Sequence, residues 1–433
     1  MKIFLDVVGC RLNQSEVEGF ANQFRALGHE IVSAAAEADI AIVNTCTVTV
    51  KAAADSRKKL RRAAREGIPM VVATGCWASL EPKAARNLPG LTHVFVNADK
   101  DALVASLLNK THEEVASLAY HRVPLPGERA RTRAFIKVQE GCDNNCTYCL
   151  TRVARGRSRS RSLSQIGKDI RAAMDGGAVE IVLTGVQLGA WGRDFSNPLR
   201  LKDLIKAILG LPGINRVRLS SIEPWEFDLS MLSLWQDERL CRHLHIPLQS
   251  GSDPILKKMG RPITLSAYQA LLEHIRHLIP DIAITTDVIT GFPGETEADF
   301  EVTKAFINQV NYAGGHVFTY SPRPGTAAYK MEGSVPPPVA KVRNKTLRKI
   351  FANTGQQFRE RFIGNTMVVL WESCVQNEDG LWQLSGLTDN YIRVISHADT
   401  NLWNQISAVK LTAHAPGRNA LNGHIVGGVT HRN

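Results

Sequence analysis

The stretch AFIKVQEGCDNNCTYC at residues 134–149 joins a predicted strand to three closely spaced cysteines. Its first residues are mostly apolar, and the loop that follows holds Cys142, Cys146 and Cys149. Three thiolates on one loop can bind three irons of a 4Fe-4S cluster, which leaves the fourth iron without a protein ligand from this run. Because an open iron can bind a substrate or cofactor, the spacing predicts a reactive cluster.

A zinc knuckle is the alternative for these three cysteines. Structural zinc sites usually combine C-x2-C pairs with a second cysteine pair or with histidines at a suitable spacing. No such pair follows Cys149 closely in the sequence. The spacing therefore favours an iron-sulfur cluster over zinc.

Strands and helices alternate along the chain that follows this loop. Apolar residues three and four positions apart predict helices, for example at 201–211 and 265–278. Six strand–helix units predict a parallel barrel of the (βα)6 type, or an open part of one. The predicted strands are 134–139, 180–184, 216–220, 243–248, 282–288 and 315–320.

The first 120 residues show a second alternation, which predicts a separate parallel α/β sheet. Cys10, Cys46 and Cys76 each follow a predicted strand directly. The carboxyl ends of parallel strands share one edge of a sheet, so we expect the three thiols to converge there. Three unrelated buried cysteines are the alternative. The predicted strands are 3–8, 40–45, 70–74 and 94–96, and the predicted helices are 13–27, 50–66 and 81–88.

The remaining segments divide the chain into domains at 1–120, 133–362 and 363–433. Residues 121–132 contain two prolines and a glycine, which is typical of a linker. A basic helix is predicted at 341–361, after the proline-rich segment VPPPV. Short β-rich segments near the C-terminus predict a small β-barrel. Its predicted strands are 366–371, 382–386, 391–396 and 406–412.

Composition limits the function classes. The chain has 433 residues, eight cysteines and a formal net charge of +11. The length predicts two to four domains, and no apolar stretch is long enough to predict a membrane span. Without a recognisable secretory signal, clustered cysteines favour reduced thiols in the cytoplasm over disulfides. The basic excess favours a polyanionic partner.

The cysteine loop, with Tyr148 before its last cysteine, resembles that of the radical S-adenosylmethionine (SAM) superfamily. The resemblance implies that the open iron chelates the amine and carboxylate of SAM, with Cys142, Cys146 and Cys149 as catalytic ligands. Further matching stretches end predicted strands, where parallel barrels place their sites. The SAM-binding residues implied by the resemblance are Tyr148, Thr184, Gly185, Gln187, Gln249, Ser250, Asp287, Gly291 and Phe292.

The two cysteine sets together resemble the radical SAM methylthiotransferases, which carry a second 4Fe-4S cluster on such an N-terminal domain. The resemblance implies two clusters, the second bound by Cys10, Cys46 and Cys76, and a TRAM-like RNA-binding barrel at 363–433. One departure is Leu150-Thr151-Arg152, where the family commonly has an apolar pair and a proline. The matching motifs are GCRLNQSE (9–16), NTCTVT (44–49), EGCDNNCTYC (140–149), ARGRSRSR (154–161), HIPLQSGS (245–252) and GFPGET (291–296).

Within this family, NTCTVT resembles the branch acting on N6-threonylcarbamoyladenosine in tRNA, 3′ of the anticodon. The implied enzyme is a transferase: reductive cleavage of SAM gives a radical that takes hydrogen from C2, the N-terminal cluster presents or donates sulfur, and a second SAM supplies the methyl group. Its implied partners are the tRNA anticodon loop, an electron donor such as flavodoxin or ferredoxin, and a sulfur donor, with no membrane. The alternatives are the isopentenyl-adenosine branch and a non-enzymatic metal-containing RNA-binding protein.

Four arginines after the cluster loop are predicted to contact RNA phosphates. A solvated surface run is the alternative, and the same choice applies to the basic residues of the 50–66 helix. In the C-terminal barrel, aromatic residues favour the core, whereas Arg393 and Lys410 are RNA candidates. Cys241 and Cys374 are predicted to be structural. The four arginines are Arg155, Arg157, Arg159 and Arg161.

Overall fold

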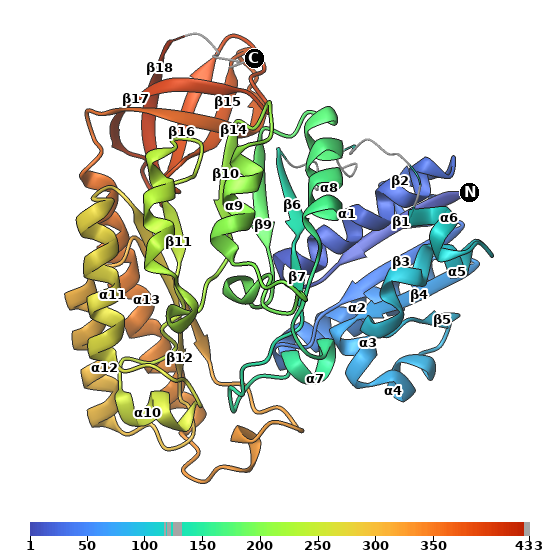
Figure 1. The fold of residues 1–433 in the computed structure, drawn as a ribbon, viewed down its shortest axis with the longest axis horizontal. Helices are drawn as coiled ribbons and strands as arrows, with labels where there is room; N and C mark the ends of the chain where they lie inside the picture. Colours follow the sequence, from blue (N-terminus) through green and yellow to red (C-terminus); the bar gives the residue numbers. More distant parts are fainter. Residues whose placement is uncertain (117, 119–122, 124–131, 428–433) are drawn as a thin grey trace.

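A computed structural model describes residues 1–116, 118, 123 and 132–427 (Figure 1). The predicted linker at 121–132 lies outside the described residues, apart from positions 123 and 132. Among the described helices, none combines the length and apolar character that a membrane crossing requires. Three parts follow one another along the chain: an α/β sheet, an open barrel and a small closed barrel.

The N-terminal part is a five-stranded parallel sheet in the order β2-β1-β3-β4-β5. Separate apolar clusters cover the two faces of this sheet. Strand β3, in its middle, is therefore buried along its whole length. This confirms the predicted parallel sheet, although the short strand β2 was missed. The strands are β1 (Lys2–Val7), β2 (Glu30–Val32), β3 (Ile40–Thr45), β4 (Met70–Gly75) and β5 (His93–Val94). The main helices are α1 (Arg11–Ala26), α2 (Val50–Arg65), α3 (Cys76–Leu80), α4 (Pro82–Arg86), α5 (Leu103–Leu107) and α6 (His112–Ala116).

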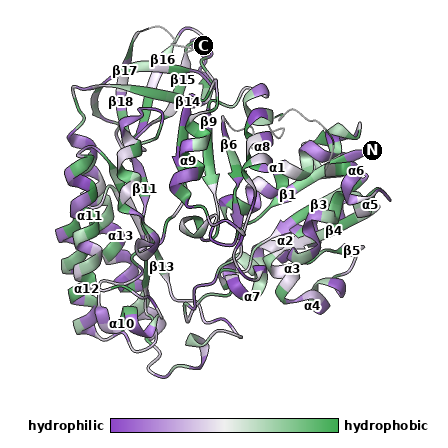
Figure 2. Ribbon diagram, viewed as in Figure 1, coloured by the Kyte–Doolittle hydropathy of each residue, from purple (hydrophilic) through white to green (hydrophobic). Residues whose placement is uncertain are grey.

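The middle part contains the six predicted strands in two parallel three-stranded sheets, β10-β9-β6 and β11-β12-β13. Bridges such as Ser221↔His245 connect the sheets, which gives an open barrel and confirms the predicted partial barrel. Strands β6 and β9 are among the hydrophobic elements in Figure 2, as expected for strands covered on both faces. The strands are β6 (Arg133–Lys137), β9 (Glu180–Thr184), β10 (Arg216–Leu219), β11 (His243–His245), β12 (Ala283–Thr290) and β13 (Gly314–Thr319). The helices are α7 (Thr151–Arg155), α8 (Leu163–Asp175), α9 (Leu201–Leu209), α10 (Asp253–Lys258), α11 (Leu265–Leu278), α12 (Glu297–Val310) and α13 (Pro337–Glu360).

The C-terminal part is a closed barrel in the order β14-β15-β16-β18-β17. Trp371 is fully buried in it and donates its indole N–H to Ser407, which confirms the predicted core role for that aromatic residue. The fifth strand, β18, was not predicted. The strands are β14 (Thr366–Gln376), β15 (Trp382–Thr388), β16 (Arg393–Ala398), β17 (Ile406–His414) and β18 (Leu421–Gly427).

The turn between β15 and β16 closes the amino-terminal end of the open barrel. Arg218 pairs with Glu180 at 2.7 Å, with both side chains fully buried, and donates to the backbone oxygens of Thr388 and Asp389. The ring of Tyr391 stacks on His243 at 4.3 Å. The C-terminal barrel is therefore joined to the strand ends opposite the cluster loop.

Candidate functional site

The three N-terminal cysteines lie at one edge of the first sheet. Cys10 precedes α1, Cys46 follows β3 and Cys76 begins α3, and strands β1, β3 and β4 are neighbours. Burial, together with the smaller effect of the nearby Cys10 and Cys76 thiolates, raises the pKa of the Cys46 thiol to about 11. The three cysteines thus follow neighbouring strands at one edge of the sheet, as predicted, while their role as ligands stays a prediction.

Two glycines allow this close approach. Gly9 has a φ of +102°, and a Cβ built there would lie 2.7 Å from the Cys46 sulfur. Gly75 has a φ of +94°, and its Cβ would lie 2.4 Å from the Thr45 carbonyl oxygen. A side chain at either position would push apart the loops that carry the cysteines.

Two asparagines outside the predicted site contact these thiols. Asn13 donates to the carbonyl oxygens of Val8 and Thr45, and its own Oδ1 lies 3.8 Å from the Cys10 sulfur. Asn97 Nδ2 lies 3.8 Å from the Cys76 sulfur. Asn13 belongs to the GCRLNQSE motif, so that motif could have identified it; Asn97 has no comparable sequence signal.

The second cysteine loop is held by backbone hydrogen bonds from both sides. Cys142 N–H donates to Gly156 at 3.1 Å, and Thr147 N–H donates to Met259 at 3.0 Å. Burial raises the pKa of Cys142 to about 12 and that of Cys146 to about 11, and the neighbouring thiolates act in the same direction. A bound metal would have to displace these protons, as thiolate ligation requires.

Thr151, the departure from the family pattern, contacts the last cysteine of the loop. Its backbone N–H lies 3.3 Å and its hydroxyl 3.1 Å from the Cys149 sulfur. Both groups can donate to a thiolate there. The departure therefore adds one side-chain contact to a predicted ligand, and removes none.

Both cysteine sets fit a cluster better than a single ion. Within the described ranges, no three His, Cys, Asp or Glu side chains converge closely enough to hold one metal ion. In a 4Fe-4S cluster each thiolate binds a different iron, so the sulfurs need not meet at one point. Each set also offers thiols alone, the donors that such clusters use.

Gln187 connects the end of β9 to the cluster loop. Its Oε1 accepts a hydrogen bond from Asp143 N–H at 2.8 Å, and its backbone N–H donates to Gln139 at 2.8 Å. Gly185 lies against the same Gln139, since a Cβ built there would be 3.1 Å from Gln139 Oε1. These two predicted cofactor residues therefore also position the loop.

Buried polar atoms at the strand ends are available to a ligand. Among the described residues, Thr184 Oγ1, Ser220 Oγ and Glu226 Oε2 are buried without a hydrogen-bond partner. Burial raises the pKa of the Glu226 carboxyl, and a hydrogen bond from Gln187 opposes that shift. Unsatisfied polar groups of this kind fit a polar cofactor at the carboxyl ends of β9 and β10.

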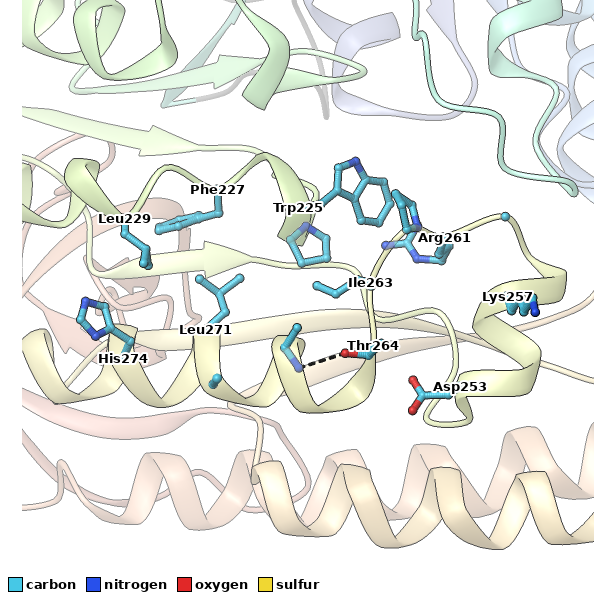
Figure 3. A pocket seen from close by; sticks show the side chains of 15 residues that line it. Trp225, Phe227, Leu229, Asp253, Lys257, Arg261, Ile263, Thr264, Leu271 and His274 are labelled. Carbon is cyan, nitrogen blue, oxygen red and sulfur yellow. Dashed lines mark hydrogen bonds between the residues drawn. The ribbon is translucent and has the colours of Figure 1, made fainter.

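Tyr148 and Phe292 pack edge to face, with ring centroids 6.3 Å apart. Phe292 is fully buried, so in this conformation it packs against the Tyr148 ring and is not exposed to a ligand. Arg261 lies 3.5 Å from the Tyr148 hydroxyl and pairs with Glu223 at 2.7 Å. Arg261 also lines a groove of about 1120 Å³ next to Trp225 (Figure 3).

The predicted SAM residues that follow β11 lie beside those at the end of β12. Gln249 has a φ of +72°, donates its N–H to the Asp287 carbonyl oxygen and accepts from Ile289. Ser250 is fully buried, and Gly291 donates its N–H to Glu295 at 2.7 Å.

The Asp287 carboxylate lies 3.2 Å from His245 Nε2. His245 also contacts Thr285 through Nδ1 at 3.0 Å and is only partly buried. The His245 ring therefore contacts the carboxylate of a predicted SAM-binding residue.

The four predicted RNA-binding arginines separate into two groups. Arg157 and Arg159 are exposed, whereas Arg161 is partly buried and pairs with Asp169. Arg155 is buried and pairs with Glu16 and Glu140, each at 2.8 Å. The predicted phosphate contact of Arg155 is wrong for this structure, because carboxylates from two domains already occupy its guanidinium.

Comparison with known proteins agrees with this geometry. Residues 136–307 match the radical SAM superfamily, and residues 2–96 match an uncharacterized protein family, UPF0004. A threonylcarbamoyladenosine tRNA methylthiotransferase, MtaB, of Thermotoga maritima is 37% identical over 90% of this chain and 90% of its own length. The chain belongs to the radical SAM methylthiotransferase family. It is accordingly a SAM-dependent iron-sulfur transferase, which confirms the predicted enzyme class and cofactors.

Other members and one solved structure extend the comparison. The MtaB protein of Bacillus subtilis is 32% identical over 93% of this methylthiotransferase and 92% of its own length. A tRNA-2-methylthio-N(6)-dimethylallyladenosine synthase of Moorella thermoacetica is 31% identical over 93% and 94%. The radical SAM methyltransferase TsrM of Kitasatospora setae superposes with a TM-score of 0.56 at 15% identity, covering 88% of this chain and 80% of TsrM, which supports the fold alone.

Proposed function

We propose that this methylthiotransferase converts N6-threonylcarbamoyladenosine, 3′ of the tRNA anticodon, to its 2-methylthio derivative. One observation carries the proposal: two three-cysteine sites lie in successive domains. Helix α7, which follows the second set, is hydrogen-bonded to residues beside the first set. The names of two relatives, the MtaB proteins of Thermotoga maritima and Bacillus subtilis, support the choice of modified adenosine. The proposed tRNA substrate also agrees with the net charge of +11.

In this proposal Cys142, Cys146 and Cys149 hold one 4Fe-4S cluster, and Cys10, Cys46 and Cys76 hold the other. Bound SAM and the clusters supply the radical, sulfur and methyl chemistry at C2 of the adenine. Gln187 keeps the radical SAM loop against β9 through Asp143 and Gln139. The nearby strand ends would hold SAM through the predicted residues Tyr148, Thr184, Gly185, Gln187, Gln249, Ser250, Asp287, Gly291 and Phe292.

RNA contacts are proposed on two exposed basic surfaces. Arg157 and Arg159 lie beside the cluster loop. A second surface follows Cys46 along α2, where Lys58, Arg61 and Arg65 are exposed. Guanidinium and ammonium groups in such rows bind phosphates through charge, which positions the tRNA without reading its bases.

The isopentenyl-adenosine reaction is the second candidate function. It is favoured by one observation, the 31% identity to the dimethylallyladenosine synthase of Moorella thermoacetica over 93% of this chain. An external electron donor such as flavodoxin or ferredoxin and a sulfur donor belong to either proposal. The two candidates differ in the substituent that must fit near the site, a threonyl carboxylate or a branched hydrocarbon.

A direct test uses anaerobically reconstituted full-length protein. About eight irons and eight sulfides per chain are expected for two complete clusters. Two tRNA preparations, one with each modified adenosine, would be incubated with SAM and a reductant, and nucleosides would be identified by mass spectrometry. Methylthiolation of only the threonylcarbamoyl tRNA supports the proposal. Product only from the isopentenyl tRNA would replace it with the second candidate.

A further inference from the structure

Helix α7 lies between the two cysteine sites. It begins two residues after Cys149 and ends at Arg155, and it packs beside α3, whose first residue is Cys76 (Figure 1). One short helix therefore touches the loop of one proposed cluster and the domain of the other.

The Arg155 guanidinium binds three residues of both domains. Nη1 donates to Glu16 and to Glu140 at 2.8 Å each, and Nη2 donates to Asn13 at 2.5 Å. Glu16 also binds Lys100 at 2.7 Å. The Arg155, Glu16 and Lys100 side chains are each only 2% exposed, so water does not compete for these contacts.

This network reaches the N-terminal thiols at two points. Asn13, bound by Arg155, lies 3.8 Å from the Cys10 sulfur. Asn97 lies 3.8 Å from the Cys76 sulfur and donates to the Ala154 carbonyl oxygen in α7 at 2.7 Å. Two independent connections therefore run from α7 to two of the three N-terminal cysteines.

Stability alone does not explain such a network. Removing charges from water costs several kcal/mol per ion, and buried ion pairs repay this only when their geometry is well satisfied. Apolar side chains of similar size would join the domains at least as firmly. A forked guanidinium instead fixes both distance and orientation, because each N–H has one defined partner.

We infer that Arg155 and Asn97 are positioning residues that fix the separation of the two cluster sites. The inference rests on the proposed function, because sulfur from one site must reach a carbon activated at the other. A shift of about 1 Å between reacting groups can reduce a rate by about 10²-fold. Removing the contacts that hold α7 should therefore reduce sulfur insertion more than SAM cleavage.

The test compares Arg155→Lys and Asn97→Ala with the wild type as reconstituted full-length proteins. Arg218→Lys is the matched control, because Arg218 forms an equally buried ion pair with Glu180 far from the thiols. EPR would measure the magnetic interaction between the two reduced clusters, and mass spectrometry would measure 5′-deoxyadenosine formed per methylthiolated nucleoside. Thermal unfolding and iron content would establish that each variant is folded and loaded.

Both variants are expected to keep both clusters, to weaken or broaden the magnetic interaction, and to form at least about tenfold more 5′-deoxyadenosine per product. The Arg218→Lys control should keep the wild-type EPR signal. An unchanged interaction and ratio in folded, loaded variants would overturn the inference. Loss of the N-terminal iron in both would also overturn it, because the residues would then retain a cluster and not position it.

Two further outcomes keep the test decisive. Should Arg155→Lys fail to fold, Asn97→Ala decides the inference alone, because Asn97 carries no charge. Should the wild type cleave SAM without thiolating either tRNA, the proposed function fails, while the EPR comparison still decides whether α7 sets the cluster separation.

Discussion

In the proposed reaction, two sets of three cysteine residues form two separate cluster sites. The radical SAM loop offers Cys142, Cys146 and Cys149, and the first sheet offers three cysteines from three different strands. Since each thiolate can bind one iron, removing one set should leave the other cluster intact. The two sets can therefore be tested separately.

Replacing Cys10, Cys46 and Cys76 together by alanine should reduce the iron content from about eight to about four per chain. SAM cleavage should continue, because its ligands lie on another loop, whereas methylthiolation should stop. Iron analysis and nucleoside mass spectrometry check this result. The reciprocal variant, with Cys142, Cys146 and Cys149 replaced, should lose SAM cleavage and keep its fold. Continued thiolation by the first variant would contradict the two-cluster assignment.

Thr151 should tune the cluster beside Cys149. Hydrogen bonds to cluster sulfurs help to set the reduction potential, and the Thr151 hydroxyl lies 3.1 Å from this sulfur. Thr151→Val keeps the side-chain shape, removes that contact and should lower the potential in an EPR-monitored redox titration. Thr346→Val is the control, because the Thr346 hydroxyl donates to the Val342 carbonyl oxygen within α13, and it should leave the potential unchanged. Equal potentials in both variants would show that the hydroxyl is not a donor.

At the scale of elements, the conformation of the cluster loop requires a glycine at position 141. Gly141 has a φ of +73°, and a Cβ built there would lie 1.9 Å from the Arg157 carbonyl oxygen. Gly141→Ala should lower the free energy of unfolding by more than the about 1–2 kcal/mol that the φ alone costs, and should reduce iron retention. Gly156→Ala, with a φ of +77°, a ψ of −162° and open space around it, should lose only the about 1–3 kcal/mol of that backbone conformation and no contact with a neighbouring loop. Urea unfolding and iron analysis would compare them.

The segment after α7 should bind RNA through two exposed side chains. Replacing Arg157 and Arg159 by alanine should reduce the slope of log affinity against log salt concentration by about 1 each, because each phosphate contact releases counterions. Arg161→Ala should change the slope less, since Arg161 pairs with Asp169. Filter binding at several salt concentrations measures the slopes. Equal slopes for all variants would place the RNA elsewhere.

The whole molecule is held together by charges buried where its parts meet. Glu180, at the start of β9, pairs with Arg218 and Arg216, and Arg218 holds the β15–β16 turn of the C-terminal barrel. Desolvation opposes ionisation of Glu180, but these arginines lower its pKa from 4.5 to about 2. The junction between the barrels therefore needs Glu180 in its charged form.

Acid should weaken this junction. The contribution of Glu180 is complete above its unfolded pKa of about 4.5 and is lost as the pH falls toward 2, a change of about 3 kcal/mol in the free energy of unfolding. Urea unfolding from pH 6 to about 2.5 measures the dependence. Glu180→Gln should be less stable near neutrality and should vary less over this range. An identical pH dependence in both proteins would contradict the assignment.

Much of this organisation could be predicted from local sequence. The three cysteines of residues 142–149 need only neighbouring positions on one loop, and periodic apolar residues determined strands such as β3 and β9 almost to the residue. The placement of Cys10, Cys46 and Cys76 after three strands sufficed as well, because parallel strands must end at one edge. Short or late strands such as β2 and β18 lack enough periodic residues to be recognised alone.

Only the tertiary structure decided what the charged residues do. Arg155 and Arg157 belong to one basic run, yet one is buried between two domains and the other is exposed. The partners of Arg155 lie 139 and 142 positions away, at Glu16 and Asn13. Local sequence carries the period of a strand and the spacing of a ligand loop, whereas the burial of a charge depends on which distant carboxylates the fold brings to it.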